Sequence, residues 1–235
     1  MAEFIGSFAL TFIGAGAIMV TGGDLVAVAL AHGVVLAVMV TALGHISGGH
    51  FNPAVTFGFV VTRRIQLDEA VRYWAGQFAG GIVAALLLRA VIDDGIVDQF
   101  NLGAPSIAEG TSVWQGFLVE VILTFLLVLV VFATAVDPHG AFKIVGGFAI
   151  GLTVGVDILM GGPLTGAAMN PQRALGPQLV AWFFEDDWVY YVAPPIGGAL
   201  AALLYDRLYL RGAAAPLAGT VESGVDQPGL KRAAE

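Results

Sequence analysis

The chain has 235 residues, of which 57% are hydrophobic and only 12% are charged, about half the charged fraction of a typical soluble domain. This composition indicates an integral membrane protein. The formal net charge of −8, from 10 Lys and Arg against 18 Asp and Glu, argues against a nucleic-acid partner, and the absence of cysteine excludes disulfides and thiol chemistry.

Six apolar runs are long enough to cross a bilayer as helices, which takes about 20 residues each. In chain order they lie near residues 3–21, 25–44, 69–92, 113–136, 143–161 and 187–210. Two shorter apolar segments, near 52–61 and 170–183, follow the second and the fifth run. Because they are too short to cross, each is expected to enter the membrane as a half-helix and return. The predicted fold is an all-α membrane protein with six transmembrane helices and two re-entrant half-helices.

The two short segments begin with the same pattern. The sequence SGGHFNPA at 47–54 has Ser47 five positions before Asn52, and TGAAMNPQ at 165–172 has Thr165 five positions before Asn170. In an Asn-Pro pair the asparagine caps a helix and the proline takes the first helical position, where its missing N–H costs nothing. Two such helix starts, one in each half of the chain, suggest half-helices that meet inside the bilayer.

The two halves of the chain resemble each other, since AEFIGSF at 2–8 echoes VEVILTF at 119–125. Three spans per half is an odd number, so the second half must run upside down relative to the first, as an inverted repeat. We expect one channel domain over 1–212, with repeats at about 1–100 and 113–211.

Charge differs between the two sides of the predicted spans. One side carries the basic residues Arg63, Arg64, Arg72, Lys143, Arg207 and Arg211, whereas the loops on the other side are acidic. Because basic loops stay in the cytoplasm, both termini are expected to be cytoplasmic. The polar tail at 213–235 is expected to be mobile there. No targeting motif is visible, so we expect a plasma or inner membrane rather than an organelle membrane.

Together, the paired Asn-Pro segments, the inverted repeat and the six spans resemble the aquaporins, or major intrinsic proteins, over about residues 2–211. Within that family, ATAVDP at 133–138 and ILMGG at 158–162 are similar to the plant tonoplast intrinsic proteins. The resemblance implies a passive channel in a lipid bilayer, no enzyme activity, no cofactor, and a homotetramer with one pore in each protomer. One departure is Gln172, where the family usually has alanine. The sequence does not decide whether Gln172 narrows the pore or lies behind the half-helix.

The meeting point of the two half-helices has a defined chemistry. Two helix N-termini place unsatisfied N–H groups and partial positive charge there, which repels cations. The amides of Asn52 and Asn170 can both donate to one water oxygen, which breaks a chain of proton hops; aquaporin-type pores are the known example of such selectivity. We therefore expect the pore midplane to be formed by Asn52, Pro53, Ala54, Asn170, Pro171 and Gln172.

A second constriction is expected on the outer side. Arg173 stands one helical turn after Asn170 and can face the same channel, and an arginine inside a membrane is costly and usually functional. The resemblance assigns the selectivity filter to His32, Ile158, Ala167 and Arg173. This set resembles tonoplast-type filters, which are associated with water and ammonia and sometimes urea. We therefore expect passive permeation of water and ammonia, with urea as a further candidate.

The resemblance also implies a set of residues that support the two re-entrant loops. In the family, acids at the positions of Glu3 and Glu120 accept the backbone N–H groups that the loops leave free, which would otherwise be buried without partners. Ser47 and Thr165, which open the two motifs, belong to this set. His50 is expected to brace the first loop rather than to bind a metal, because no third ligand is evident.

Three alternatives compete with this interpretation. A urea or glycerol facilitator is one, although Ala174 stands where glycerol facilitators tend to have aspartate. A proton-coupled transporter is another, because transporters also use inverted repeats and Asp157 offers a carboxyl group within a predicted span. The third, an intramembrane hydrolase, is not supported, because the chain contains neither Gly-x-Ser-x-Gly nor His-Glu-x-x-His.

Overall fold

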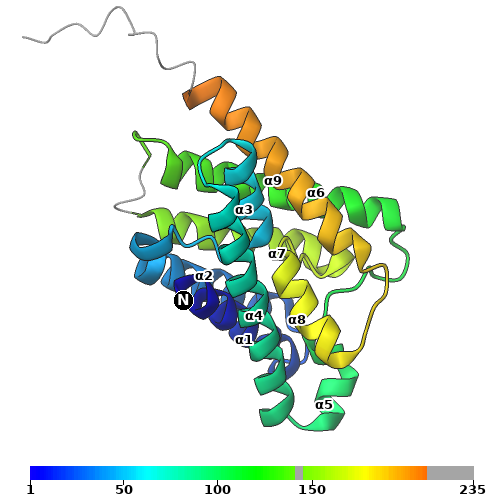
Figure 1. The fold of residues 1–235 in the computed structure, drawn as a ribbon. Coiled ribbons are helices and arrows are strands. Elements are labelled where there is room, and N and C mark those ends of the chain that lie inside the picture. Colours follow the sequence, from blue (N-terminus) through cyan, green and yellow to red (C-terminus); the bar gives the residue numbers. More distant parts are fainter. Residues whose placement is uncertain (141–144, 211–235) are drawn as a thin grey trace, which may run out of the picture.

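The computed structural model describes residues 1–140 and 145–210, and within this part the chain is helical and has no β-strand (Figure 1). Six of the described helices are long and apolar enough to cross a membrane. They are α1 (Ala2–Val20), α2 (Leu25–Ser47), α4 (Leu67–Val91), α6 (Val113–Val131), α7 (Gly147–Thr165) and α9 (Trp188–Tyr205). The π-helical turns η2 (Phe132–Val136) and η4 (Asp206–Leu210) extend α6 and α9. The predicted transmembrane fold is confirmed, whereas the tail predicted at 213–235 lies outside the described residues.

The two predicted half-helices are α3 (Pro53–Val61) and α8 (Pro171–Ala181). Asn52 caps α3 by accepting the N–H of Ala54 at 2.8 Å, and Asn170 caps α8 by accepting that of Gln172 at 3.2 Å. Each proline occupies the first helical position, so the local chemistry that predicted these helix starts also explains them. Two further elements, which the sequence patterns did not predict, lie between α4 and α6: α5 (Asp94–Gln99) and the short 3-10 turn η1 (Asn101–Gly103).

Left-handed glycines set the ends of the two helices that lead into the re-entrant loops. The fifth span ends at Thr165, four residues later than predicted, and Gly166 (φ 74°) then donates its N–H to the carbonyl of Gly162 at 3.0 Å. The second span likewise continues to Ser47 and is ended by Gly48 (φ 84°). Glycine adopts this conformation at little steric cost, so each helix continues until such a glycine turns the chain.

Equivalent helices of the two halves pack in the same way. A Cβ on Gly80 of α4 would overlap the carbonyl oxygen of Phe4 in α1, and a Cβ on Gly197 of α9 would overlap that of Val121 in α6. Both residues of the second contact stand 117 positions after those of the first. Close approach through glycine is typical of helix packing in membranes, and here it is used twice in the same way.

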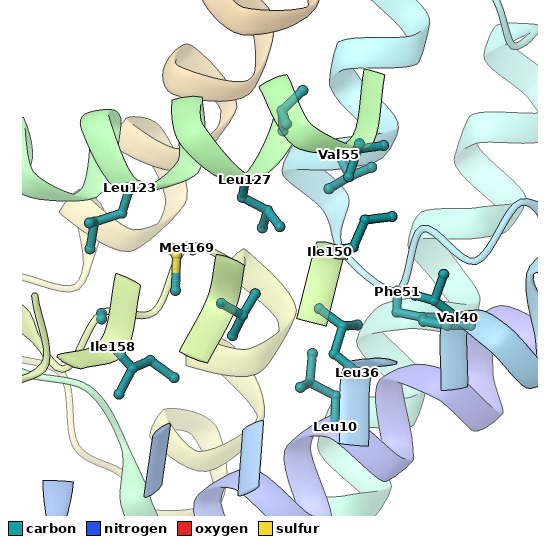
Figure 2. Close-up of a cluster of buried hydrophobic side chains, with 14 of the residues drawn as sticks. Leu10, Leu36, Val40, Phe51, Val55, Leu123, Leu127, Ile150, Ile158 and Met169 are labelled. Carbon is teal, nitrogen blue, oxygen red and sulfur yellow. The ribbon is translucent and has the colours of Figure 1, made fainter. Parts of the chain in front are cut away.

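The two halves meet in the centre of the molecule. There α2 packs so closely on α7 that a Cβ on Gly33 would lie 2.8 Å from the carbonyl oxygen of Gly151. Buried apolar side chains from α1, α2, α3, α6 and α7 converge on this region, as Figure 2 shows for Leu10, Leu36, Val55, Leu127 and Ile150. The same five residues line a central cavity, so the core of this protein is also the wall of that cavity.

Candidate pore and filter

Glu3 of α1 holds the first re-entrant loop. Its Oε1 accepts hydrogen bonds from the Ser47 hydroxyl at 2.6 Å and from the backbone N–H of His50 at 3.0 Å. Its Oε2 accepts from the N–H of Phe51 and from the side chain of Gln77, both at 2.7 Å. Glu3 is buried, and water does not reach the loop there. These bonds therefore satisfy loop donors that would otherwise be buried without a hydrogen-bond partner.

Glu120 of α6 holds the second loop in the same manner. Its Oε1 accepts from the Thr165 hydroxyl at 2.7 Å and from the N–H of Ala168 at 2.9 Å, and its Oε2 accepts from the N–H of Met169 at 2.7 Å. Glu120 is completely buried. The structure thus brings the four residues expected to support the loops together as two pairs, Glu3 with Ser47 and Glu120 with Thr165.

The two loops also bind each other. Asn52 donates through Nδ2 to the carbonyl of Met169 at 2.8 Å, and Asn170 donates through Nδ2 to the carbonyl of Phe51 at 2.9 Å. Phe51 (φ 47°) and Met169 (φ 52°) lie in the left-handed region, which costs conformational energy for residues other than glycine. Each asparagine amide thus donates one hydrogen bond to the opposite loop, and both asparagines line the central cavity.

The other four residues expected at the midplane lie away from the described lining of the central cavity. Pro53 and Pro171 line a groove on a different side of the half-helices, and Ala54 is completely buried. The physical reason is that only the first two helical positions of each half-helix turn toward neighbouring helices, whereas the capping asparagine and the third helical residue, Val55 or Arg173, line the cavity.

Gln172 is also completely buried, and its two polar ends are both bonded. Its Nε2 donates to the carbonyl of Phe51 at 3.3 Å, and its Oε1 accepts from the hydroxyl of Thr11 in α1 at 3.2 Å. The question that the sequence left open therefore has an answer. Gln172 lies behind the half-helix, outside the lining of the central cavity, and ties α8 to α1 and to the opposite loop.

The four residues predicted for the filter all line the central cavity. Nε of Arg173 donates to Nε2 of His32 at 3.4 Å, and Nδ1 of His32 lies 2.9 Å from the carbonyl of Val28, which fits the imidazole tautomer with its proton on Nδ1. Nη1 of Arg173 is buried and has no hydrogen-bond partner among the described residues. Ile158 and Ala167 add apolar surface to the same cavity.

A narrow cavity and a wide vestibule share two of these residues. The central cavity has a volume of about 30 Å³, which is room for about two water molecules. The vestibule, lined among others by Ser106 and Pro163, has a volume of about 440 Å³. Ile158 and Arg173 line both spaces, so they mark the boundary between them. A solute at this boundary touches hydrocarbon from one residue and a cation from the other.

Sequence reasoning missed two features of the site. Gly14 of α1 lies so close to His32 that a Cβ on it would overlap the imidazole ring, and only the packing of α1 against α2 reveals this. His50 lines the central cavity as well as bracing its loop, and its Nδ1 lies 3.0 Å from the hydroxyl of Thr56. The one available signal for His50 was its place two residues before Asn52.

Asp157 stands next to Ile158 on α7 but is absent from the described linings of the cavity and the vestibule. It is 4% exposed, and its Oδ2 finds no hydrogen-bond partner in the part of the chain that the structure describes. This placement provides no contact with a solute in the cavity.

Polar contacts tie the far ends of α6 and α9 together. Asp137, which follows η2, accepts from the N–H of His139 at 2.9 Å and from the hydroxyl of Tyr205 at 2.8 Å, and these bonds hold the pKa of Asp137 below its usual range. Arg64, which follows α3, forms an ion pair with Asp206 at 2.8 Å.

Among the described residues, no group of three or more His, Cys, Asp or Glu is arranged to hold a metal ion.

Comparison with known proteins gives concordant results. A family model described as "Major intrinsic protein" matches residues 1–205. The probable aquaporin TIP3-2 of Arabidopsis thaliana is 44% identical over 226 residues, which cover 89% of this chain and 83% of that protein. Aquaporin TIP4-4 of Zea mays is 48% identical over 222 residues, which cover 89% of this chain and 86% of that protein. Among solved structures, the aquaglyceroporin from Plasmodium falciparum matches with a TM-score of 0.75 and 26% identity, over 88% of this chain and 94% of that one.

Proposed function

The chain belongs to the major intrinsic protein family, and from this we propose that its pore conducts ammonia as well as water. As a member of that family it is an integral membrane channel for water and small solutes and not an enzyme. The observation that carries the finer proposal is the boundary between cavity and vestibule, where apolar Ile158 and charged Arg173 line the same passage, beside a cavity with room for about two water molecules.

The filter favours small neutral solutes with weak demands for hydrogen bonds. The side chains of Ile158 and Ala167 cannot form hydrogen bonds. Among the four filter residues, only Arg173 and His32 have side chains that can form hydrogen bonds with a solute. Water loses more hydrogen bonds on entering such a passage than ammonia does, and the discrimination between the two is therefore weaker than in a filter with polar groups on every side.

Exclusion of ions and protons rests on the midplane. The N-termini of α3 and α8 carry partial positive charge beside their capping residues, Asn52 and Asn170. This charge repels cations. The remaining amide hydrogen of each asparagine is available to a single water oxygen in the cavity. A water molecule held in this way points its own hydrogens along the pore in opposite directions, which interrupts proton transfer.

Neither alternative channel chemistry is favoured by a specific observation. The central cavity has room for about two water molecules, which favours water and ammonia over the larger urea and glycerol, and Ala174 beside the filter arginine is completely buried. A proton-coupled transporter would need a carboxyl group in contact with the solute, and Asp157 lies outside the described cavity lining.

The test uses the purified full-length protein in liposomes. Stopped-flow shrinkage measures water permeability, and alkalinisation of an internal pH-sensitive dye under an ammonia gradient measures ammonia permeability. We expect both to exceed those of protein-free liposomes, with urea and glycerol fluxes at the protein-free level. Ammonia flux equal to that of protein-free liposomes would refute the ammonia proposal while leaving the water channel intact.

Assembly and location complete the proposal. We expect a homotetramer, supported by apolar residues that α2 exposes one turn apart, Val26, Leu30, Val34 and Val38. Light scattering of the detergent-solubilised complex measures its mass.

The expected location in a plasma or inner membrane finds no support in the comparisons, whose relatives carry TIP names. Single cysteines introduced at each terminus of this cysteine-free chain would report, by reaction with an impermeant reagent, whether both termini are cytoplasmic.

A further inference from the structure

A second large space lies outside the central cavity. It is a groove of about 540 Å³ on the side of α3 and α8 that carries their prolines, and α4 and α9 form its other walls. Its size falls in the range of about 300–1,000 Å³ typical of ligand pockets. Apart from the prolines, most of the side chains that line it are half-buried, so the groove opens to the surroundings of the helix bundle.

The groove lies on the axis that relates the two repeats. Pro53 and Pro171 both line it and stand 118 positions apart, as do Phe57 and Leu175.

The walls from the spans repeat this relationship. Trp74 and Tyr191 both line the groove and stand 117 positions apart, as do Phe78 and Pro195. Every residue that lines the groove therefore has its repeat counterpart in the same lining. The axis of an inverted repeat lies in the plane of the membrane, at its middle. The groove is thus at the depth where the ends of the lipid tails from both leaflets meet.

The lining of the groove is apolar, and the polar groups of its side chains already form hydrogen bonds within the protein. Trp74 and Tyr191 carry the polar side-chain atoms of the lining, and both are used inside the protein. Nε1 of Trp74 donates to the carbonyl of Pro53 at 3.2 Å, and the hydroxyl of Tyr191 donates to Oε1 of Gln178 at 2.5 Å. A ligand in the groove therefore gains packing contacts but no hydrogen bonds to these side chains.

We propose that this groove binds the terminal segment of a phospholipid acyl chain from the surrounding bilayer. The groove opens between α4 and α9, both of which are apolar and long enough to cross a membrane and expose apolar side chains, among them Val192 and Ile196, next in sequence to the lining residues Tyr191 and Pro195. The occupant follows from chemistry and depth and does not depend on which solutes the pore conducts.

A second copy of the chain fits the groove less well. Helices pack closely in membranes through small residues, which let their backbones approach. The groove is walled instead by large rings, those of Phe57, Trp74, Phe78 and Tyr191. A helix is a convex rod about 10 Å across and cannot follow such a recess, whereas a flexible acyl chain can. The acyl chain then packs against Pro53 and Pro171, directly behind the asparagines that line the pore.

The experiment uses Trp74 as the reporter, because its indole lines the groove. The full-length chain with Trp114→Phe, Trp182→Phe and Trp188→Phe, reconstituted in liposomes, keeps Trp74 as its single tryptophan. Phosphatidylcholine brominated near the methyl end of its chains should quench Trp74 more strongly than phosphatidylcholine brominated near the carbonyl. A matched chain that keeps Trp188 instead serves as the reporter for tails outside the groove.

Two further substitutions separate a bound tail from tails that merely surround the protein. Leu175→Phe adds a ring inside the groove, and Leu179→Phe adds one to an exposed position of the same helix outside it. We expect Leu175→Phe to lower quenching of Trp74 by about half, because the added ring takes the space of the tail, and Leu179→Phe to leave it unchanged. Equal quenching in the two variants would overturn the proposal, as would a Trp74 that no bromine quenches while the Trp188 reporter is quenched, which is the result for a groove covered by protein. Water permeability in the liposome assay checks that each variant is folded.

Discussion

Arg173 and His32 are joined by a hydrogen bond of 3.4 Å from Nε to Nε2 that links α8 to α2 across 141 positions of the chain. Because α8 belongs to the second repeat and α2 to the first, this pair forms only when both halves have folded together. His32 is held further by the carbonyl of Val28 at 2.9 Å and by the close packing of Gly14 against its ring. The imidazole is therefore fixed on several sides, and it in turn positions the guanidinium.

Replacing His32 with phenylalanine should reduce ammonia permeability more than water permeability. The larger ring cannot move toward Gly14 and must extend into the cavity, and Arg173 loses an acceptor and binds water instead. Loss of one hydrogen bond of about 1 kcal/mol corresponds to about a fivefold lower ammonia flux. Stopped-flow permeabilities of the two solutes in the same liposomes provide the ratio. A larger loss for water than for ammonia would contradict the filter assignment.

Gly14→Ala should close the pore from behind the filter. The new methyl group would overlap the ring of His32, which can yield only toward the cavity, so most of the water permeability should disappear. Gly16→Ala, two residues along α1, is the matched control, because its Cβ would lie 3.1 Å from the flexible end of Leu88. Similar water permeability in the two variants would show that His32 does not respond to this packing.

Glu120→Gln should destabilise the second re-entrant loop. The amide that replaces one carboxylate oxygen cannot accept, so at least one buried donor among Thr165, Ala168 and Met169 loses its partner, at a cost of about 1–3 kcal/mol. Thermal unfolding of the detergent-solubilised protein should therefore occur at a lower temperature. The exposed Glu109→Gln serves as the control. An unchanged unfolding temperature for Glu120→Gln would mean that the carboxylate does not stabilise the second re-entrant loop.

The half-helices show what local sequence is able to predict. Their starts were predictable because Asn52 with Pro53, and Asn170 with Pro171, carry the cap and the first helical position in adjacent residues. The ends of the preceding spans depend on where a glycine adopts the left-handed conformation. Composition does not identify such a glycine, so the predicted end of the fifth span lies four residues before the observed end at Thr165.

Contacts between helices that are distant in sequence were beyond local reasoning. Gly14 behind His32, and Thr11 beside Gln172, become visible only when α1 is packed on its neighbours. The repeat predicts which helices are equivalent, but it does not predict that the face of α3 and α8 that carries the prolines turns away from the cavity. Sequence patterns thus identified the residues near the pore, and tertiary packing decided which of them line it.

Gln172→Ala tests whether this glutamine acts as a tie between helices. The variant loses the bonds to Thr11 and to the carbonyl of Phe51, so it should unfold more easily by about 1–2 kcal/mol. Its water permeability should stay unchanged, because Gln172 lies outside the described cavity lining. Combining it with Thr11→Val should give less than the sum of the two single effects, since the pair shares one bond. An increase in water permeability would show instead that Gln172 narrows the pore.

Asp157→Asn should stabilise the protein and leave permeation unchanged. The carboxyl group is buried on α7 with an oxygen that lacks a hydrogen-bond partner among the described residues, and an ionised group in that position is costly. The amide has the same shape and no charge, so the thermal midpoint should rise by an amount that corresponds to about 1–2 kcal/mol. Asp98→Asn, at an exposed position of α5, should show no such rise. Loss of a flux that depends on a proton gradient in the Asp157→Asn liposomes would instead identify Asp157 as a proton carrier and the protein as a transporter.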